Sequence, residues 1–551
     1  MGAFGCLLTL IAPCLLHAQN GVMVIDSLNQ RHGGPGPSWG FYYASCWGYV
    51  APDGHEYALI GCYSGTSIID LDATPVTEVD FIPGANNEWK EIKVWDHYAY
   101  AVSENQSQGL QIIDLQYLPD SARLVRTYTT LNGRNVARSH TVTVADGYLY
   151  LNGGSSNGTT IWSLADPLTP AYVGQFQTEY VHDTYVRNDT MLAAAIFGQG
   201  CYVVSLANKA APVQIGVISY PNSGTHNAWL SVSGRHVFTT DETGFTAKNM
   251  KVWDISALPI VTALTPHTFN PSTVIHNVHG RGNYVYVAHY KSGVYVADVH
   301  NPAAISTAGT YNTYRGGGFD ASYAGCWGVY PYFPSGRWIA SDTQTGLYIF
   351  TFTGLAPRIR PSLLSPASGD SAGPGTTFRW QLAASQFEDP HWYEVHIWGT
   401  GVDTLLKIYD TTLALPSLNG LQDGQTYSWH VWTKDEYTSV TGLDTFQFVF
   451  DAGTVGVEPS EQQPRAFHLF QNYPNPFNPT TSISFYVPAV GLVTLKVFNV
   501  LGEEVAMLVN KSMQPGEHTV RFDASGLPSG MYMCRLGSND LSISRKMVLM
   551  K

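Results

Sequence analysis

Four histidines in the middle of the chain are the residues best suited to chemistry. Each stands near the start of a short stretch in which apolar and polar residues alternate, as is typical of a β-strand. The stretches are "SHTVTV" with His140, "YVHDTYV" with His182 and Asp183, "THNAWLSV" with His226, and "IHNVHG" with His276. Imidazole and carboxylate groups bind Zn, Cu, Ni or Fe, and a histidine beside an aspartate also serves as a general base.

The rest of the sequence offers little other catalytic chemistry. It contains no GxSxG nucleophile elbow, no HExxH zinc motif and no glycine-rich phosphate loop. His279 and His289 are further candidate ligands, and we interpret each as an ordinary strand histidine. The four repeated histidines therefore remain the main candidates, and their meaning depends on the elements that position them.

Those elements belong to a repeated unit. Seven related strings recur at intervals of about 42 to 53 residues, and each is preceded by two short strand-like stretches and followed by a third. The strings are "GTSIIDL" ending at Leu71, "GLQIIDL" at Leu115, "GTTIWSL" at Leu164, "GCYVVSL" at Leu206, "MKVWDI" at Ile255, "GVYVADV" at Val299 and "GLYIFTF" at Phe352. Four short strands in a unit of this length are typical of a β-propeller blade, so the sequence predicts a seven-bladed β-propeller.

The ring closure is also predictable. After "GLYIFTF" the chain continues as "TGLAPRIRP", which offers no fourth strand for the last unit. Residues 21–28, "GVMVIDSL", form a strand-like stretch without a partner nearby in the sequence. We predict that this segment completes the last blade, because that pairing removes two exposed sheet edges.

The histidines occupy matching points on the innermost strands of the third to sixth units. Their counterparts in the other units are predicted near Trp47, near Trp89 and Lys90, and at Trp327. Four imidazoles would then converge at one mouth of the channel. Three interpretations remain open. The histidines could be hydrogen-bonding residues in a wet channel, or they could form a Zn-like transition-metal site in which His182 and Asp183 supply nitrogen and oxygen ligands. The third interpretation is hydrolysis of a small ester or lactone at the channel mouth.

The repeated segments also resemble a known family. "YASCWGYVAPDGHEYALIGCYSGTSIIDL", "WKEIKVWDHYAYAVSENQSQGLQIIDL" and "GGFDASYAGCWGVYPYFPSGRWIASDTQTGLYIF" are similar to the LVIVD-repeat proteins of the choice-of-anchor B family. The resemblance covers residues 21–352. It implies a secreted or surface-anchored propeller, and it assigns no catalytic residue.

The sequence pattern changes after the predicted propeller. "TTFRWQL", "HWYEVHIWG", "QTYSWHVWTKD" and "DTFQFVF" read as strands, and "LNGLQDGQTYSWHVW" resembles the late strands of fibronectin type III domains. We expect Trp380, Tyr427 and Trp429 to be core aromatics. A spacer role is favoured over carbohydrate contact, because the aromatic residues alternate as core residues do.

The C-terminal segment is very similar to the type A sorting domain of the type IX secretion system. The similarity rests on "NYPNPFNP", "KVFNVLG", "GEHTVRFDASGLPSGMY" and the final "RKMVLMK". It implies passage through the periplasm and across the outer membrane by way of the type IX machinery. Attachment to surface lipopolysaccharide, or release, would follow.

Composition limits the remaining alternatives. The apolar run "MGAFGCLLTLIAPCLLHA" predicts a signal peptide that is cleaved after Ala18. The net charge is -13 and no Lys/Arg cluster occurs, which argues against a nucleic-acid partner. No later stretch has the roughly 18 apolar residues that span a membrane.

Five cysteines remain after the signal peptide: Cys46, Cys62, Cys201, Cys326 and Cys534. Their odd number and the absence of a CxxC pair argue against a disulfide framework or a zinc–thiolate site. A bridge between Cys46 and Cys326 is conceivable, because both precede a Trp-Gly pair in neighbouring units. We expect buried free thiols instead.

The sequence thus predicts an all-β chain: a seven-bladed β-propeller, a fibronectin type III-like β-sandwich and a small C-terminal β-sandwich sorting domain. The predicted boundaries are a signal peptide at 1–18, the propeller at 19–356, the sandwich at 357–452, a linker at 453–466 and the sorting domain at 467–551. We expect a secreted or cell-surface-anchored protein with a non-catalytic binding or scaffold role toward an unknown extracellular ligand. The alternative is a metal-dependent hydrolase acting on an ester or lactone at the channel mouth, with His140, His182, Asp183, His226 and His276 as candidate metal ligands.

Overall fold

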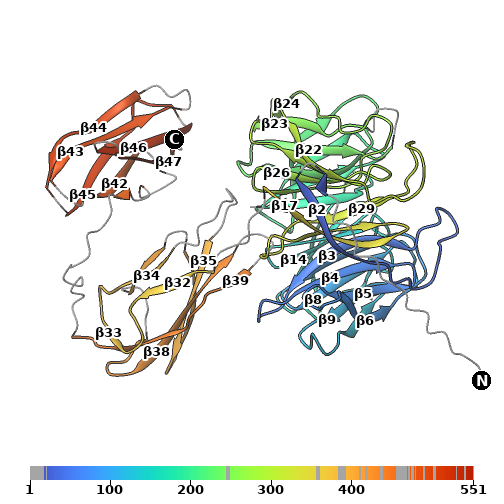
Figure 1. Cartoon of the computed structure of the whole chain (residues 1–551), viewed down its shortest axis with the longest axis horizontal. Coiled ribbons are helices and arrows are strands. Elements are labelled where there is room, and N and C mark those ends of the chain that lie inside the picture. The colour runs from blue at the N-terminus through green and yellow to red at the C-terminus, as the bar shows by residue number, and fades with distance from the viewer. Residues whose placement is uncertain are drawn as a thin grey trace, which may run out of the picture. The chain divides into compact units, whose positions relative to one another are not determined.

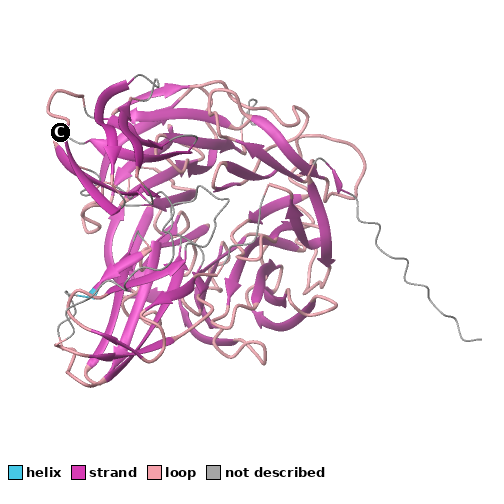
Figure 2. Cartoon of the chain, turned by 60° about the vertical axis from the view of Figure 1, so that its left-hand side comes forward, coloured by secondary structure: helices cyan, strands magenta, loops and turns pink. Residues whose placement is uncertain are grey.

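The computed structural model is all-β. It describes residues 18–19, 21–177, 179–187, 189–243, 248–354, 360–381, 392–408, 411–415, 420–434, 439–453, 468–469, 472, 477, 479–487, 490–499, 504–514, 516–528, 530–538 and 541–549. These residues contain no α-helix, and Figure 2 shows strands throughout the described chain, which confirms the predicted fold class. Accordingly, no helix in this part of the chain is long and apolar enough to cross a membrane.

Two compact units divide the chain, Met1–Gly456 and Val457–Lys551. The division falls inside the predicted linker at 453–466, of which all but residue 453 lies outside the described residues. The predicted signal peptide at 1–18 also lies outside them, apart from Ala18. The two units are described separately below.

Seven antiparallel sheets, numbered here in chain order of their inner strands, make up the propeller in the described part of the first unit (Figure 1). Sheet 1 contains β3 (Tyr43–Val50), β4 (Glu56–Cys62), β5 (Gly65–Asp70) and β6 (Thr77–Pro83), and sheet 2 contains β7 (Lys90–Trp95), β8 (Tyr98–Ser103), β9 (Leu110–Asp114) and β10 (Arg123–Tyr128). Sheet 3 contains β13 (Thr141–Ala145), β14 (Tyr148–Asn152), β15 (Thr159–Ser163) and β16 (Ala171–Phe176), and sheet 4 contains β17 (Asp183–Arg187), β18 (Thr190–Ala195), β19 (Gly200–Ser205) and β20 (Val213–Ser219). Sheet 5 contains β21 (Thr225–Leu230), β22 (His236–Asp241), β23 (Lys251–Ala257) and β24 (Ile260–Ala263), and sheet 6 contains β25 (Val278–Arg281), β26 (Tyr284–Ala288), β27 (Val294–Asp298) and β28 (Ser306–Tyr311). Sheet 7 contains β29 (Cys326–Tyr330), β30 (Trp338–Asp342), β31 (Gly346–Phe352), β2 (Val22–Leu28) and β1 (Ala18–Gln19), and a small hairpin joins β11 (Thr130–Leu131) to β12 (Arg134–Asn135).

The first strands of the seven sheets form a closed ring. Along the chain, β3, β7, β13, β17, β21, β25 and β29 each contact the next, and β29 contacts β3. Apolar side chains between the sheets form the core, for example Leu59, Ile112, Leu192 and Val285, all of which are fully buried. The ring brings side chains that lie far apart in the sequence to a common channel.

Most of the repeated strings begin with a glycine, which stands at or just before the start of the third strand of its sheet. Gly109 and Gly346 have φ values of +70° and +94°, which side chains rarely adopt. A Cβ atom at Gly109 would lie 2.5 Å from the carbonyl oxygen of Tyr128, and one at Gly346 would lie 2.4 Å from that of Leu28. The glycine therefore lets the fourth strand pair closely with the third.

The predicted closure by residues 21–28 is confirmed. β2 pairs antiparallel with β31 from Val22 opposite Phe352 to Leu28 opposite Leu347, with one irregularity between Val24 and Asp26. Val22 and Val24 are buried against the apolar core of sheets 6 and 7. The N-terminal strand thus covers an edge that would otherwise expose unpaired backbone groups.

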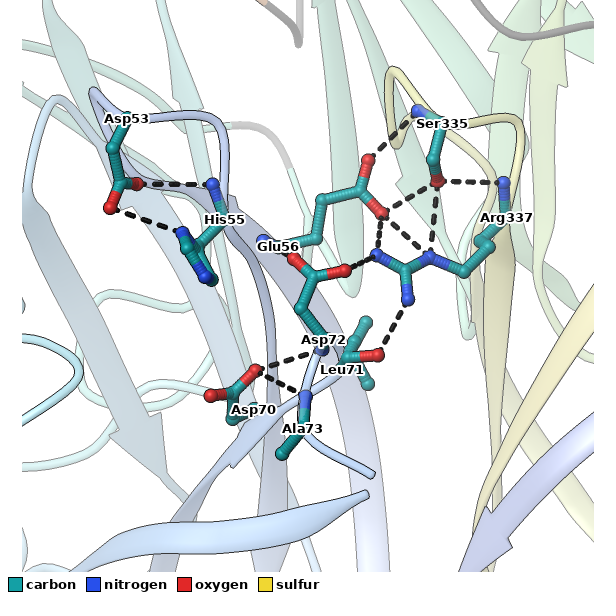
Figure 3. Close-up of polar contacts among 9 residues, drawn as sticks. All are labelled: Asp53, His55, Glu56, Asp70, Leu71, Asp72, Ala73, Ser335 and Arg337. Atoms are coloured by element: carbon teal, nitrogen blue, oxygen red, sulfur yellow. Dashed lines mark hydrogen bonds and ion pairs between the residues drawn. The ribbon is translucent and has the colours of Figure 1, made fainter. Parts of the chain in front are cut away.

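A polar cluster joins sheet 7 to sheet 1 (Figure 3). The guanidinium of Arg337 contacts the carboxylate of Glu56 at 2.7 Å and that of Asp72 at 2.5 Å, and it donates a hydrogen bond to the Leu71 carbonyl oxygen at 2.5 Å. Glu56 also accepts hydrogen bonds from the main chain of Ser335 at 2.8 Å and from its hydroxyl at 2.6 Å. Both oxygens of this buried carboxylate are therefore paired.

Residues after the propeller form a second set of sheets. One contains β32 (Ser362–Ser365), β34 (Thr377–Gln381) and β37 (Thr412–Ala414); the other contains β33 (Asp370–Ala372), β40 (Phe446–Phe450), β38 (Thr426–Lys434), β35 (Trp392–Gly399) and β36 (Val402–Ile408), with β39 (Ser439–Thr441) paired to β38. Trp380, Tyr427 and Trp429 are buried in one core, which confirms their predicted place. The Tyr427 hydroxyl accepts a hydrogen bond from the Gln422 main chain at 2.9 Å and donates one to the Thr400 carbonyl at 3.3 Å.

The second unit contains two sheets with a shared apolar core. One has the order β41 (His468–Leu469), β42 (Thr480–Val487), β45 (Gly516–Asp523), and the other has the order β44 (Glu504–Met513), β43 (Gly491–Phe498), β46 (Gly530–Ser538), β47 (Leu541–Leu549). Val493, Leu495 and Val497 alternate on β43 and are fully buried. That period of two makes one face of the strand the core face.

Five cysteines are free and buried: Cys46, Cys62, Cys201, Cys326 and Cys534. The expected free thiols are confirmed, and Cys46 and Cys326 form no disulfide. Burial raises the pKa of the Cys46 thiol to about 12, so this sulfur stays protonated.

Candidate functional site

Strand register identifies the equivalent residues of the seven inner strands. In each sheet one residue of the inner strand pairs, through the second strand, with the residue three positions before the end of the repeated string. In sheet 1, for example, Trp47 pairs with Leu59 and Leu59 with Ile68. The seven residues so aligned are Trp47, Lys93, Thr143, Tyr185, Trp229, His279 and Tyr330, called here the aromatic layer. The residues three positions earlier are Ala44, Lys90, His140, His182, His226, His276 and Trp327, called here the histidine layer.

This register corrects one sequence-based prediction. Lys90 and Trp327 do lie at the positions that correspond to the histidines. Trp47 does not, because it aligns with Trp229 and packs against His279 and Tyr330, with ring centroids 5.8 and 5.0 Å away. Ala44 takes the histidine position in sheet 1. β3 continues to Val50, which pairs with Glu56, whereas β29 ends at Tyr330, which pairs with Ile339, so the two hairpins set Trp47 and Trp327 at different levels.

The four predicted histidines do converge. Ring centroids lie 4.0 Å apart for His140 and His182, 4.2 Å for His182 and His226, and 4.0 Å for His226 and His276. The series ends on Trp327, whose ring centroid is 4.6 Å from that of His276. His182, His226 and His276 are 5%, 4% and 1% exposed, so the layer is more deeply buried than a wet channel implies.

Burial keeps the imidazoles of His182, His226 and His276 neutral. It is the largest influence on His182 and His226, and together with the neighbouring histidines it holds the pKa of each ring well below the ordinary value. Burial also lowers the pKa of His276 to about 3. Neutral imidazoles retain a lone pair on one nitrogen, which is the form that binds a metal ion.

Two carboxylates that were not predicted from the sequence lie close to the histidine layer. Glu242 directly follows β22, and its two oxygens lie 3.7 Å from Nε2 of His226 and 3.7 Å from Nε2 of His276. Burial raises the pKa of Glu242, although a hydrogen bond from the Tyr290 hydroxyl opposes the rise. The signal available in the sequence was an acidic residue immediately after the second strand of a repeat.

Glu104 occupies the same place after β8, but its surroundings differ. It accepts a hydrogen bond at 2.9 Å from Nδ1 of His140 and one at 3.2 Å from the Tyr180 hydroxyl, and Nε of Arg138 lies 3.2 Å away. Burial favours the protonated acid, yet these partners outweigh it and lower the pKa of Glu104. Its negative charge is therefore already compensated by the chain.

The structure places the other candidate ligands elsewhere. Among the described residues, His182, His226 and Glu242 form the group whose candidate ligand atoms all lie within 4.8 Å of one another, and Asp183 is not in it. The Asp183 carboxylate accepts a hydrogen bond from the Asn227 amide at 2.7 Å, and burial raises its pKa to about 6. His279 belongs to the aromatic layer, and Nδ1 of His289 contacts the Thr273 hydroxyl at 3.0 Å.

The aromatic layer lines a pocket. Its seven residues are joined there by Glu91, Asp183, Asn227 and Asn277, which lie one position beyond the histidine layer on their strands. Glu91 forms an ion pair with Lys93, whose ammonium nitrogen lies 4.2 Å from the centroid of the Trp47 ring. Propeller residues supply seven carboxylates and three cationic side chains to this lining: Asp53, Glu56, Asp72, Glu91, Asp96, Asp146 and Asp183 against Lys93, Arg187 and Arg337.

Comparison with protein families gives two matches. Residues 471–550 match the secretion system C-terminal sorting domain, and residues 276–313 match the LVIVD repeat. The chain therefore carries an LVIVD-repeat propeller and a type IX sorting domain, as the sequence resemblances imply. The sorting domain marks the protein for export to the cell surface or the extracellular space through the type IX machinery.

Other comparisons add little. No curated protein matches the chain. Similar solved structures include a putative 6-phosphogluconolactonase from Bacteroides fragilis (11% identity, 57% of this chain and 95% of that chain, TM-score 0.39) and the hydrazine synthase of Kuenenia stuttgartiensis (12% identity, 58% and 99%, TM-score 0.41). The C-terminal WD40 domain of Sif2 is also similar (10% identity, 61% and 91%, TM-score 0.39). At these TM-scores no functional statement follows from the similarity.

Proposed function

We propose that the protein is an exported, non-catalytic binding protein that presents the aromatic-layer pocket of its propeller to an extracellular ligand. The observation that carries the proposal is the lining of that pocket. Trp47 and Trp229 line it together with the carboxylate residues Glu91 and Asp183 and the amide residue Asn277. Such a lining suits a ligand that is rich in hydroxyl groups and carries positive charge.

Charge supports the same ligand class. Arg337 forms ion pairs with Glu56 and Asp72, and Lys93 forms one with Glu91. Arg187 donates a hydrogen bond to the Ser231 carbonyl at 2.6 Å. Asp53, Asp96, Asp146 and Asp183 add four further carboxylates to the propeller side of the lining, so this side of the pocket attracts cationic groups.

Binding of chitosan oligomers to the mature full-length chain tests this proposal. These probes are both cationic and hydroxyl-rich, and calorimetry should detect them while oligogalacturonate, which is acidic, gives no signal. Asp183→Asn should weaken chitosan binding at least tenfold, and Asp26→Asn on the exposed surface of β2 is the matched control. Equal binding of the acidic probe, or unchanged binding in Asp183→Asn, contradicts the proposed pocket.

A metal-dependent hydrolase is the second candidate, because His182, His226 and Glu242 lie within ligand distance of one another. Catalytic metal sites keep an open coordination position for water or substrate. The buried imidazoles of the histidine layer favour a closed site instead. Hydrolysis of p-nitrophenyl acetate or a γ-lactone by the zinc-loaded chain, lost in His226→Gln, would favour the hydrolase over the binding protein.

We also propose that the protein is displayed on the cell surface, attached to lipopolysaccharide, or released, after the sorting domain has acted. The second compact unit contains that domain and has its own core. Removal of residues 467–551 should therefore leave a folded propeller in the periplasm. Surface or extracellular localisation of the truncated chain would contradict this route.

A further inference from the structure

We propose that His182, His226, His276 and Glu242 bind one divalent first-row transition metal ion, with Zn²⁺ as the representative, and that this ion ties sheets 4, 5 and 6 together inside the propeller. His226 lies on β21, His182 and His276 lie within two residues before β17 and β25, and Glu242 follows β22 of sheet 5. This site goes beyond the proposed ligand-binding pocket and does not depend on it.

The distances suit a small tetrahedral site. One oxygen of Glu242 lies 3.7 Å from Nε2 of His226, and the other lies 3.7 Å from Nε2 of His276. Ligand atoms held about 2.0–2.1 Å from a tetrahedral zinc ion are separated from one another by roughly 3.3–3.5 Å. Candidate ligand atoms of His182, His226 and Glu242 lie within 4.8 Å of one another, and His276 joins this group through its 3.7 Å approach to Glu242, so side-chain rotations can bring the four donors to bonding distance.

An unpartnered nitrogen points to a missing ligand. Nδ1 of His276 bonds the main-chain oxygen of Trp327 as a hydrogen donor, which leaves the lone pair on Nε2. That Nε2 atom has no hydrogen-bond partner among the described residues, although its side chain is 1% exposed. Native proteins seldom leave a buried polar atom of this kind without a partner.

The carboxylate is held in place for coordination. The hydroxyl of Tyr290 donates a hydrogen bond to one oxygen of Glu242. Such a contact from a residue that does not itself touch the metal fixes the orientation of a ligand. Within the described residues no lysine or arginine forms an ion pair with Glu242, in contrast to Glu104 with its neighbour Arg138.

The donor set selects the class of metal. Three imidazoles and one carboxylate suit Zn²⁺, Cu²⁺, Ni²⁺ or Fe²⁺, whereas Ca²⁺ and Mg²⁺ prefer sites built from oxygen atoms. Four protein ligands and deep burial are the features of a structural site. The ion would therefore stabilise the ring of sheets without reacting.

Metal binding by the untagged, chelator-stripped mature chain tests the proposal. Dialysis against Zn²⁺ followed by elemental analysis should give about one equivalent, and the zinc-loaded chain should unfold at a higher temperature than the stripped chain. Mg²⁺ at the same concentration should produce neither effect. A wild-type chain that binds no zinc, or gains no thermal stability from it, overturns the proposal.

Two variants locate the ion. Glu242→Gln should bind zinc at least 100-fold more weakly in competition with a chromophoric chelator, whereas Glu104→Gln, the same change at the equivalent place in sheet 2, should retain wild-type affinity. His226→Gln should show the same loss, with circular dichroism reporting whether the variant is folded. If folded Glu242→Gln and His226→Gln retain wild-type affinity, zinc binds elsewhere and the assignment is wrong. Chitosan binding is measured in parallel, so failure of this site is distinguishable from failure of the pocket.

Discussion

Two polar clusters lie between neighbouring sheets of the propeller, and they differ in how completely their atoms are paired. At the seam between sheets 7 and 1, Glu56 accepts hydrogen bonds or ion pairs on both oxygens, from Ser335 and Arg337. In the histidine layer, His276 and its neighbours place neutral nitrogens around one carboxylate, and Nε2 of His276 has no hydrogen-bond partner in the described structure.

The difference separates a structural cluster from a binding cluster. A buried carboxylate and guanidinium that satisfy each other need nothing further from solvent or ligand. Buried imidazoles with depressed pKa values cannot compensate a carboxylate by ionising, so an added cation would complete the set. The same ring of sheets thus contains one cluster whose buried charges are paired by the protein itself and one whose carboxylate and imidazoles would be paired by a metal ion.

Removing a partner from the cluster between sheets 7 and 1 should have the largest effect on the free energy of unfolding. Arg337→Ala leaves the buried Glu56 without its cation, and loss of one partner from a buried pair costs about 3–5 kcal/mol of unfolding free energy. Urea unfolding should show this loss, while zinc stoichiometry should stay at the wild-type value because the seam is separate from the histidine layer. Arg126→Ala on the exposed strand β10 is the control, and an equally small change in both variants would mean that the seam is not a structural junction.

Lys90 provides an intermediate case within the histidine layer. Its ammonium donates to the Ala85 carbonyl at 2.5 Å and to the Gln108 side chain at 3.2 Å, and burial lowers its pKa to about 8 from 10.5. The unfolded chain therefore binds this proton more tightly than the folded chain does between pH 8 and 10.5, so stability should rise with pH across that window.

Lys90→Met should remove that pH dependence. Relative to the variant, the wild-type chain should gain up to about 3 kcal/mol of unfolding free energy between pH 8 and pH 10.5. The quantity to measure is the difference between the two proteins in urea unfolding at each pH, because tyrosine and cysteine titration affects both alike. A constant difference across the window would show that Lys90 is not destabilised by burial.

Tyr290→Phe tests the metal site with the smallest change in structure and the smallest expected effect. The variant removes only the hydroxyl that donates to Glu242, and loss of such an orienting contact typically weakens metal binding 10–100-fold. Tyr323→Phe is the matched control, since the Tyr323 hydroxyl donates to the main-chain oxygen of Glu242 at 3.4 Å and not to its carboxylate. Equal zinc affinities for the two variants would exclude an orienting role for Tyr290.

Much of this organisation is predictable from local pattern. The repeated strings locate the third strand of every sheet, and the unpaired stretch at 21–28 identifies the closing strand. The spacing of the histidines from those strings places four of them at one level of the ring. These features depend on periodicity and on pairing between adjacent strands, both of which the sequence displays.

Relations across sheets are harder to predict. "CWG" occurs at Cys46 and again at Cys326, yet Trp327 lies in the histidine layer and Trp47 in the aromatic layer. The first hairpin closes at Val50 opposite Glu56 and the last at Tyr330 opposite Ile339, and no residue type marks this difference in pairing. Glu242 was missed for a related reason, because its carboxylate meets His276 from another sheet and only the closed ring brings the two together.

Anomalous diffraction at the zinc absorption edge, from crystals of the zinc-loaded mature chain, would locate the proposed ion. We predict one strong peak about 2.0–2.2 Å from Nε2 of His226, Nε2 of His276 and an oxygen of Glu242, with a nitrogen of His182 as the fourth ligand. A loaded crystal with no peak in the histidine layer, or with its peak beside Asp183 and Glu91 in the aromatic-layer pocket, would contradict it.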